Sequence, residues 1–281
     1  MRILLGAPVW YGNRPFKQTI EALYRLGLDY FEFSLDYPLP ECMSEKEREA
    51  MRGLLEEFGL KIAFHSPLDI AVAHPRNAVA DASMTILRQC MAFSAEFHPL
   101  SLYYNVHVHP KVSTYAFEDV RAELKKKGLS RCAELAQMAS EFGIPVSVEN
   151  DLIPFERSDL IHEALSSTTL SFTFDIGHAI MAEVMHSSMK GGSYMDYLER
   201  WVARCGANLL VVHLHDCSFT AKRDHLSLGR GELDFNRIFA LLKRTSCNYA
   251  VIETFWRNTE KEEMNYDEMR RNVAFCRRAL V

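Results

Sequence analysis

Six short apolar segments of this chain each end in a residue that can bind a metal ion or move a proton. In chain order these residues are His65, His109, Glu149, Asp175, His213 and Glu253. Buried carboxylates are rare unless they are paired, and three that converge would repel one another and raise each other's pKa. A divalent cation removes that penalty, and a mixed set of imidazoles and carboxylates suits zinc or manganese. The residue types therefore predict a divalent-metal site, provided that the fold brings the six segment ends together.

Two of these segments carry a second histidine, His107 before His109 and His215 after His213. In "LLVVHLHD", residues 209–216, the two histidines lie two positions apart, so they point to the same face of a strand. A single strand-end histidine is more often a core residue whose ring nitrogens are satisfied. Six consecutive strands with an ionisable group at the same level argue against that interpretation here, and at least one histidine of the pair is expected to bind the metal.

The elements that must position these residues alternate regularly along the chain. Strands are predicted over residues 2–8, 29–35, 60–66, 102–110, 144–150, 170–176, 208–216 and 248–254. Helices are predicted over residues 44–58, 78–97, 117–142, 194–205, 235–243 and 266–280. The first of these helices opens with a capping box, Ser44 with Glu47. Glycines that are typical of helix C-termini precede four strands, at positions 27, 59, 143 and 206.

Eight strand–helix repeats without a composition break predict one (β/α)₈ barrel, a TIM barrel, spanning residues 1–281 as a single domain. A doubly wound open sheet is the alternative, but it normally carries a glycine-rich phosphate loop, which is not visible. In a barrel the C-terminal strand ends form the face where chemistry occurs. That face is where the six ionisable groups are expected.

The composition limits the binding partners and the cellular compartment that we expect for this protein. The net charge of −5 gives no overall attraction to nucleic acid. The seven cysteines show no CxxC pair and no signal peptide precedes "MRILLGAP", so we expect reduced thiols in a cytoplasmic protein. No apolar run approaches the ~20 residues that a membrane span needs.

These segments resemble the xylose-isomerase-like TIM-barrel superfamily, which includes sugar isomerases and epimerases as well as endonuclease IV. The resemblance covers nearly the whole chain and is carried, in order, by "FHSPLDI", "VEN", "FDIGHA", "VHLHD", "HLSLGRGELDF" and "VIET". It implies that the residues matching the ligands of the shared metal are Glu149, Asp175, His213 and Glu253. It also implies that His65 and His109 hold a further ion in multi-metal members, whereas His215 occupies a variable position beside the ligands or in the core.

The resemblance implies a divalent-metal-dependent (Zn, Mn, Mg or Co) isomerase or epimerase that acts on a sugar or sugar phosphate. In such enzymes two metal-bound glutamates, here Glu149 and Glu253, pass a proton through an enediolate. We expect His178, His225, Arg223, Trp10 and Trp256 to contact the substrate, the two tryptophans as an apolar wall. Tyr11 and Phe255 are interpreted as loop packing. Glu32 is expected to face inward, as a hydroxyl acceptor or paired with an arginine.

The alternative is an endonuclease IV-like, zinc-dependent abasic-site phosphodiesterase. The third zinc of that enzyme uses a D-x-H motif after strand seven, and this chain reads Arg223-Asp224-His225 there. Arginine thus stands where the aspartate belongs, and an adjacent cation opposes zinc binding. No basic stripe for a duplex is visible either, so nucleic acid is not the expected partner. A catalytically silent sugar-binding barrel would predict loss of one glutamate of the pair, and both are present.

Overall fold

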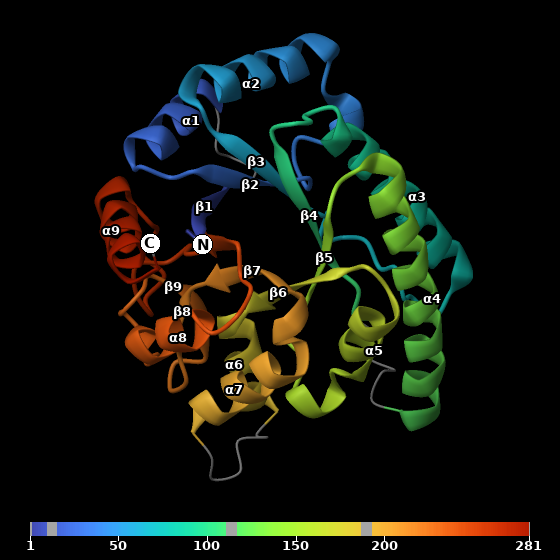
Figure 1. The fold of residues 1–281 in the computed structure, drawn as a ribbon. Helices are drawn as coiled ribbons and strands as arrows, with labels where there is room; N and C mark the ends of the chain where they lie inside the picture. The colour runs from blue at the N-terminus through green and yellow to red at the C-terminus, as the bar shows by residue number, and fades with distance from the viewer. Residues whose placement is uncertain (1, 10–15, 111–116, 187–192, 281) are drawn as a thin grey trace.

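Eight parallel strands close into a barrel in the computed structural model, which describes residues 2–9, 16–110, 117–186 and 193–280. The barrel strands are β1 (Leu4–Val9), β2 (Tyr30–Ser34), β3 (Lys61–His65), β4 (Ser101–His107), β5 (Val146–Glu149), β6 (Ser171–Asp175), β7 (Leu209–Leu214) and β10 (Tyr249–Ile252). They neighbour one another in chain order, and β1 closes the ring against β10 (Figure 1). The predicted (β/α)₈ barrel is confirmed.

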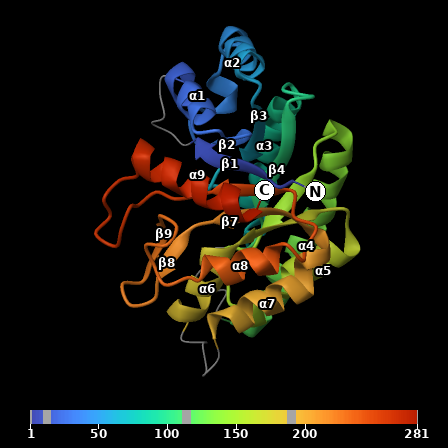
Figure 2. The same cartoon turned by 60° about the vertical axis from the view of Figure 1, so that its left-hand side comes forward.

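Helices surround the barrel on its outside (Figures 1 and 2). They are α1 (Phe16–Arg25), α2 (Glu45–Phe58), α3 (Asn77–Ala95), α4 (Glu118–Phe142), α5 (Asp159–Ser167), α6 (Ile176–Met185), α7 (Tyr194–Cys205), α8 (Phe235–Leu242) and α9 (Tyr266–Leu280). The six predicted helices are all present, and the capping box of Ser44 and Glu47 forms as expected. None of the helices in the described ranges is both long and apolar enough to cross a membrane.

Three helices, α1, α5 and α6, lie where no helix was predicted. Helix α6 begins directly at the end of β6 and is buried over most of its length. A helix that is apolar all round has no polar face, so it lacks the periodicity that marks an amphipathic helix. Helix α5 has only nine residues, which gives that periodicity little length to show.

The predicted glycine caps hold at three helices and fail at a fourth. Gly27, Gly59 and Gly143 follow α1, α2 and α4 in the left-handed conformation, with φ of 76°, 63° and 67°. Gly206 follows α7 with φ of −63°, because the chain continues there into a short 3-10 turn, Gly206–Asn208. A glycine before a strand therefore does not by itself identify a left-handed cap.

The barrel interior changes from apolar to polar along its axis. At the N-terminal end the rings of Tyr30, Tyr103 and Tyr249 pack against one another with centroids 5.2–6.1 Å apart. Gly6 leaves room for this floor, since a Cβ there would lie 2.5 Å from Tyr30 Cζ. Side chains alternate along a strand, so the residues two and four positions further on also face inward, nearer the C-terminal end. There the sequence places its ionisable residues.

A short antiparallel hairpin, β8 (Asp216–Ser218) with β9 (Arg223–Leu226), follows β7 and was not predicted. Its anchor is the buried Asp216 carboxylate, which accepts four backbone hydrogen bonds, from the N–H groups of Cys217, Gly229, Gly231 and Leu233 at 2.8–3.1 Å. These bonds tie the "GRGEL" segment to the end of β7. The hairpin thereby holds His225 beside the barrel mouth.

Candidate metal-binding active site

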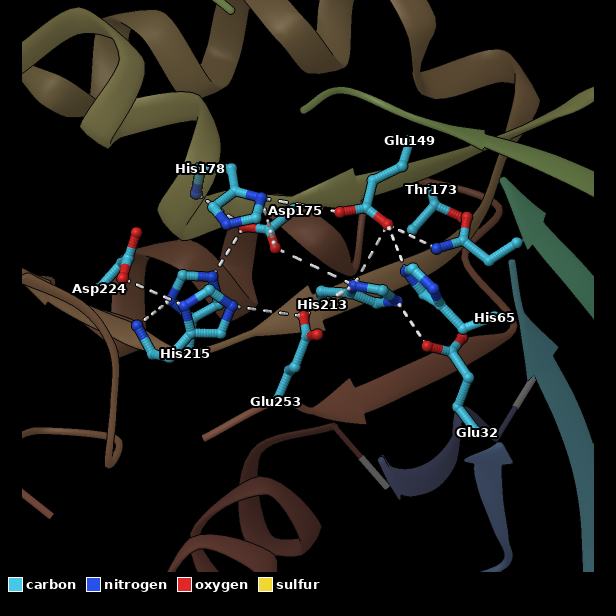
Figure 3. Close-up of polar contacts among 12 residues, drawn as sticks. Glu32, His65, Glu149, Thr173, Asp175, His178, His213, His215, Asp224 and Glu253 are labelled. Atoms are coloured by element: carbon cyan, nitrogen blue, oxygen red, sulfur yellow. Dashed lines mark hydrogen bonds and ion pairs between the residues drawn. The ribbon is translucent and has the colours of Figure 1, made fainter. Parts of the chain in front are cut away.

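The strand-end residues meet at the C-terminal mouth of the barrel, with His213 at their centre (Figure 3). His213 Nδ1 lies 2.9 Å from Glu253 Oε2, 3.6 Å from Glu149 Oε2 and 4.0 Å from Asp175 Oδ2. The His213 side chain is fully buried, and so are those of Glu149 and Asp175. The four side chains come from β5, β6, β7 and the residue after β10, as the alternation along each strand requires.

The donor set fits a divalent cation. Ligand atoms of Glu149, Asp175 and His213 lie within 4.8 Å of one another, and Glu253 reaches the same His213 nitrogen. His213 Nδ1, Asp175 Oδ2 and Glu253 Oε2 are buried, and although the first and last lie 2.9 Å apart, none of the three makes a hydrogen bond of good geometry within the described residues. Buried polar atoms without a hydrogen-bond partner are costly, and a cation would satisfy all three. Three carboxylates and one imidazole are appropriate ligands for Zn²⁺ or Mn²⁺.

The pKa shifts in this site follow from the crowding of opposite charges. Burial lowers the pKa of His213, but the charges of Glu253, Glu32 and Glu149 outweigh it and raise the pKa well above its usual value. Burial raises the pKa of Glu149, but the charges of His107 and His213 bring it well below the usual range. His213 likewise brings the pKa of Glu253 below its usual value against the effect of burial. Protons on the imidazoles therefore balance the carboxylates.

A second group forms beside the first, from His65, His107 and Glu149. His107 Nε2 lies 3.2 Å from His65 Nε2, and His107 Nδ1 lies 2.9 Å from Asp151 Oδ1. Burial lowers the pKa of His65, but its hydrogen bond to Glu149 and the charges of neighbouring glutamates raise the pKa to about 9.

The predicted end of strand four was wrong by three residues, because β4 stops at His107 rather than at Pro110. His109 is also buried, but His107 is the β4 histidine that approaches His65 and Glu149. In the described part of the chain, His109 belongs to no group that could hold a metal ion. The two histidines share a strand face, and the sequence pattern alone could not tell which of them lies at the level of Glu149.

A third group consists of Asp175, His178, His215 and His225. His178 Nδ1 lies 3.2 Å from Asp175 Oδ2. Burial lowers the pKa of His178, but the charges of Asp175 and Glu149 outweigh this effect and raise the pKa to about 10. Asp224 turns toward this group, with Oδ1 3.2 Å from His225 Nδ1. Arg223, its neighbour on β9, is exposed and pairs with Ser218 across the hairpin.

Of the two tryptophans predicted to form an aromatic wall, the structure describes Trp256, which follows β10. Trp10 and Tyr11 lie outside the described residues. Trp256 is half-buried, forms bridges to Leu226 and Glu263, and has Lys261 Nζ 5.4 Å from its ring centroid. Phe255, which was interpreted as loop packing, stacks on His225 with ring centroids 4.6 Å apart.

Two asparagines that sequence reasoning overlooked support the ligands. Asn105 on β4 donates a hydrogen bond from Nδ2 to Glu149 Oε2. Asn150, fully buried, accepts a hydrogen bond from the Asp175 N–H at 2.7 Å and donates to the Asp175 carbonyl at 2.9 Å. Glu32 faces inward as expected, but its Oε1 lies 3.4 Å from His213 Nε2. The signal for Asn105 and Glu32 was a polar residue at an inward position of a buried strand, whereas Asn150 follows the end of β5 and carried no such signal.

Comparison with known proteins identifies the family of this chain. A family model described as xylose isomerase-like TIM barrel matches residues 20–278. The chain belongs to the xylose isomerase-like TIM-barrel family. A relative in this comparison is the uncharacterized protein MJ1311 of Methanocaldococcus jannaschii, 23% identical over 210 residues, which are 72% of this chain. The match spans 66% of that relative's own length.

Solved structures with the xylose isomerase-like barrel align over almost the whole chain. A D-tagatose 3-epimerase-like protein has a TM-score of 0.75 at 18% identity, with 99% of this chain and 97% of the other covered. D-psicose 3-epimerase of Clostridium cellulolyticum H10, solved with D-tagatose, has a TM-score of 0.76 at 13% identity, with 99% of each chain covered. An AP endonuclease, family 2, of Brucella melitensis has a TM-score of 0.67 at 13% identity, with 100% and 99% covered. At such identities the likeness shows the fold alone.

Proposed function

We propose that this protein is a divalent-metal-dependent isomerase or epimerase that moves a proton on a carbon next to the carbonyl of a ketose or ketose phosphate. The observation that carries the proposal is the convergence of Glu149 and Glu253 on His213 Nδ1, at 3.6 and 2.9 Å, in a buried polar mouth. The family and its structural neighbours, among them sugar epimerases, support it.

The metal would be held by Glu149, Asp175, His213 and Glu253. Bound there, a divalent ion polarises a substrate carbonyl and stabilises the negative charge that develops on its oxygen. The remaining tasks belong to the chain itself: the barrel walls exclude water, and the tyrosine floor closes the opposite end.

Glu149 and Glu253 are the proton-moving groups of this proposal. Their lowered pKa values keep both carboxylates ionised at neutral pH, which is the form that accepts a proton. They come from β5 and from the end of β10, which are not neighbours in the barrel. One carboxylate can therefore remove a proton from one face of the substrate carbon and the other can return a proton to a different face. The result is an enediolate that is reprotonated as the isomer or epimer.

An abasic-site phosphodiesterase is the second candidate, because three adjoining groups of His, Asp and Glu side chains could each hold an ion. An AP endonuclease is also among the structural neighbours. Against it, Arg223 stands at the position expected for an aspartate, although Asp224 reaches His225 from the next position. The Arg223 side chain is exposed, and the sequence shows no basic stripe that could hold a duplex.

The test compares wild type with Glu253→Gln, which keeps a ligand oxygen but removes the base. Both are incubated with Mn²⁺ and a panel of ketoses and ketose phosphates in deuterated water, beside an abasic-site duplex. Deuterium should enter one sugar with wild type and ~10²–10⁴-fold more slowly with the variant. Glu57→Gln on the exposed face of α2 is the control and should match wild type. Cleavage of the duplex with no deuterium exchange in any sugar would contradict the isomerase proposal and support the phosphodiesterase.

A further inference from the structure

His215 is fully buried beside the candidate metal site, yet both of its ring nitrogens are already engaged. Nε2 lies 2.9 Å from Asp175 Oδ1. Nδ1 accepts a hydrogen bond from the backbone N–H of His225 at 2.9 Å. One ring thus connects a candidate metal ligand on β6 to the backbone of the β8–β9 hairpin (Figure 3).

The backbone N–H determines which tautomer the ring adopts. A backbone amide does not lose its proton, so Nδ1 must present a lone pair to His225 and cannot carry a proton. The proton of the neutral imidazole is then on Nε2, which donates to Asp175 Oδ1. A nitrogen that carries a proton cannot bind a metal ion. His215 is therefore a donor to Asp175 rather than a ligand, although it lies in the third group of possible ligands.

This donated bond leaves one carboxylate oxygen of Asp175 available. Oδ1 accepts from His215 Nε2 and also from the backbone N–H of His178 at 2.7 Å. Oδ2 is buried and makes no hydrogen bond of good geometry among the described residues; it lies 3.2 Å from His178 Nδ1 and 4.0 Å from His213 Nδ1. With Oδ1 held from two directions, the carboxylate cannot rotate, and Oδ2 points at the site where the ion would bind.

The surroundings of His215 are shaped to hold its ring in this orientation. A Cβ on Gly177 would lie 1.9 Å from His215 Cε1 and 2.3 Å from Nδ1, so only glycine fits at this point of α6. On the opposite side His225 stacks on the His215 ring with centroids 4.1 Å apart and planes at 7°, and Phe255 stacks on His225 in turn. The ring is thereby clamped between the first turn of α6 and the hairpin.

We propose that His215 is a positioning residue: its Nδ1 accepts from the His225 backbone, and its Nε2–H aims Asp175 Oδ2 at the bound ion. The proposal rests on the metal site of the proposed function, but not on the identity of the substrate. Groups that orient metal ligands typically change metal affinity by ~10–100-fold when they are removed. Gly177 is part of the same device, because a larger residue there would displace the ring.

Two substitutions separate the donated bond from mere filling of space. In His215→Gln the amide nitrogen can occupy the place of Nε2 and still donate to Asp175. In His215→Asn the shorter side chain can replace only Nδ1, so the bond to Asp175 is lost. Mn²⁺ affinity, measured by calorimetry on the metal-free full chain, should fall ~10–100-fold in His215→Asn and stay within a few-fold of wild type in His215→Gln. His162→Asn, on the exposed face of α5, is the matched control and should bind as wild type does.

A second measurement reads the tautomer directly in the wild-type protein, so the proposal stays testable if a variant fails to fold. Nitrogen-15 spectra of the histidine rings, assigned by the signal missing in His215→Gln, should show a protonated Nε2 and an unprotonated Nδ1. A protonated Nδ1, wild-type affinity in His215→Asn, or equal losses in both variants would each overturn the proposal. Failure of wild type to bind Mn²⁺ would contradict the proposed function instead, while the tautomer would still report on His215.

Discussion

Exchange of protons for metal is the consequence of this site that can be worked out most fully. In the metal-free protein, a raised pKa keeps His213 protonated at neutral pH among Glu253, Glu32 and Glu149. An imidazole must lose its proton before it binds a metal ion, so binding at the four-residue site should release about one proton per ion. One released proton makes the binding constant rise about tenfold per pH unit, or ~1.4 kcal/mol per unit. If a second ion binds His65, whose pKa is raised to about 9, a further proton should be released.

The assay is calorimetric titration of the chelator-treated protein with Mn²⁺ at pH 7.5, in two buffers whose ionisation heats differ strongly. The difference in apparent binding heat between the buffers gives the number of protons released. A value near one with a single ion per chain is expected, together with a dissociation constant that falls about tenfold from pH 7 to pH 8. Binding without proton release, or an affinity that does not change between pH 6.5 and 8.5, would refute the charge balance inferred around His213.

Further expectations concern the metal-free protein and single substitutions. The pKa values of His65 and His178 are raised to about 9 and about 10, so the stability that their protonated forms contribute is complete below about pH 6.5 and is lost as the pH rises through 9 to 10. Urea unfolding at pH 7 and pH 10 should show this decrease, and equal stability at the two pH values would contradict it. Asp175→Ala should abolish tight metal binding in calorimetry and remove the N-cap of α6, which costs ~1 kcal/mol; unchanged affinity would refute the ligand assignment. Asp216→Asn should cost ~2–4 kcal/mol in urea unfolding, because an amide cannot accept all four backbone hydrogen bonds; a loss below ~1 kcal/mol would contradict the anchoring role. Trp201→Ala, which empties a fully buried site against Phe172, should cost ~3–5 kcal/mol in the same measurement, and a surface-like effect would contradict the packing.

The barrel could be predicted from the sequence because its signals are local and repeated. Each strand is a short apolar run, and the predicted and observed strands differ mainly at their ends. The hidden elements are those without such a signal: α6 is buried along most of its length, and the β8–β9 hairpin is defined by the hydrogen bonds to Asp216. Those bonds join residues up to 17 positions apart, which no local pattern records.

The candidate site was predictable in type but not in register. Alternation along a strand places Glu149, Asp175 and His213 at one level, and the structure brings these side chains together. Alternation cannot tell whether His107 or His109 lies at the level of Glu149, because it assigns both histidines to the same strand face. The pairing of His107 with Glu149 between β4 and β5 identifies His107. The role of His215 was equally hidden, since it depends on a backbone N–H ten residues further along the chain.

The central claim is that one divalent ion binds between Glu149, Asp175, His213 and Glu253, and anomalous diffraction from a manganese-loaded crystal tests it most directly. The account predicts an anomalous peak bonded at ~2.0–2.2 Å to side-chain atoms of these four residues, with Asp175 contributing Oδ2. A second anomalous peak beside His65 and His107 would indicate a second ion and is compatible with the account. A peak held only by His178 and His225, or no peak within reach of His213, would contradict the account.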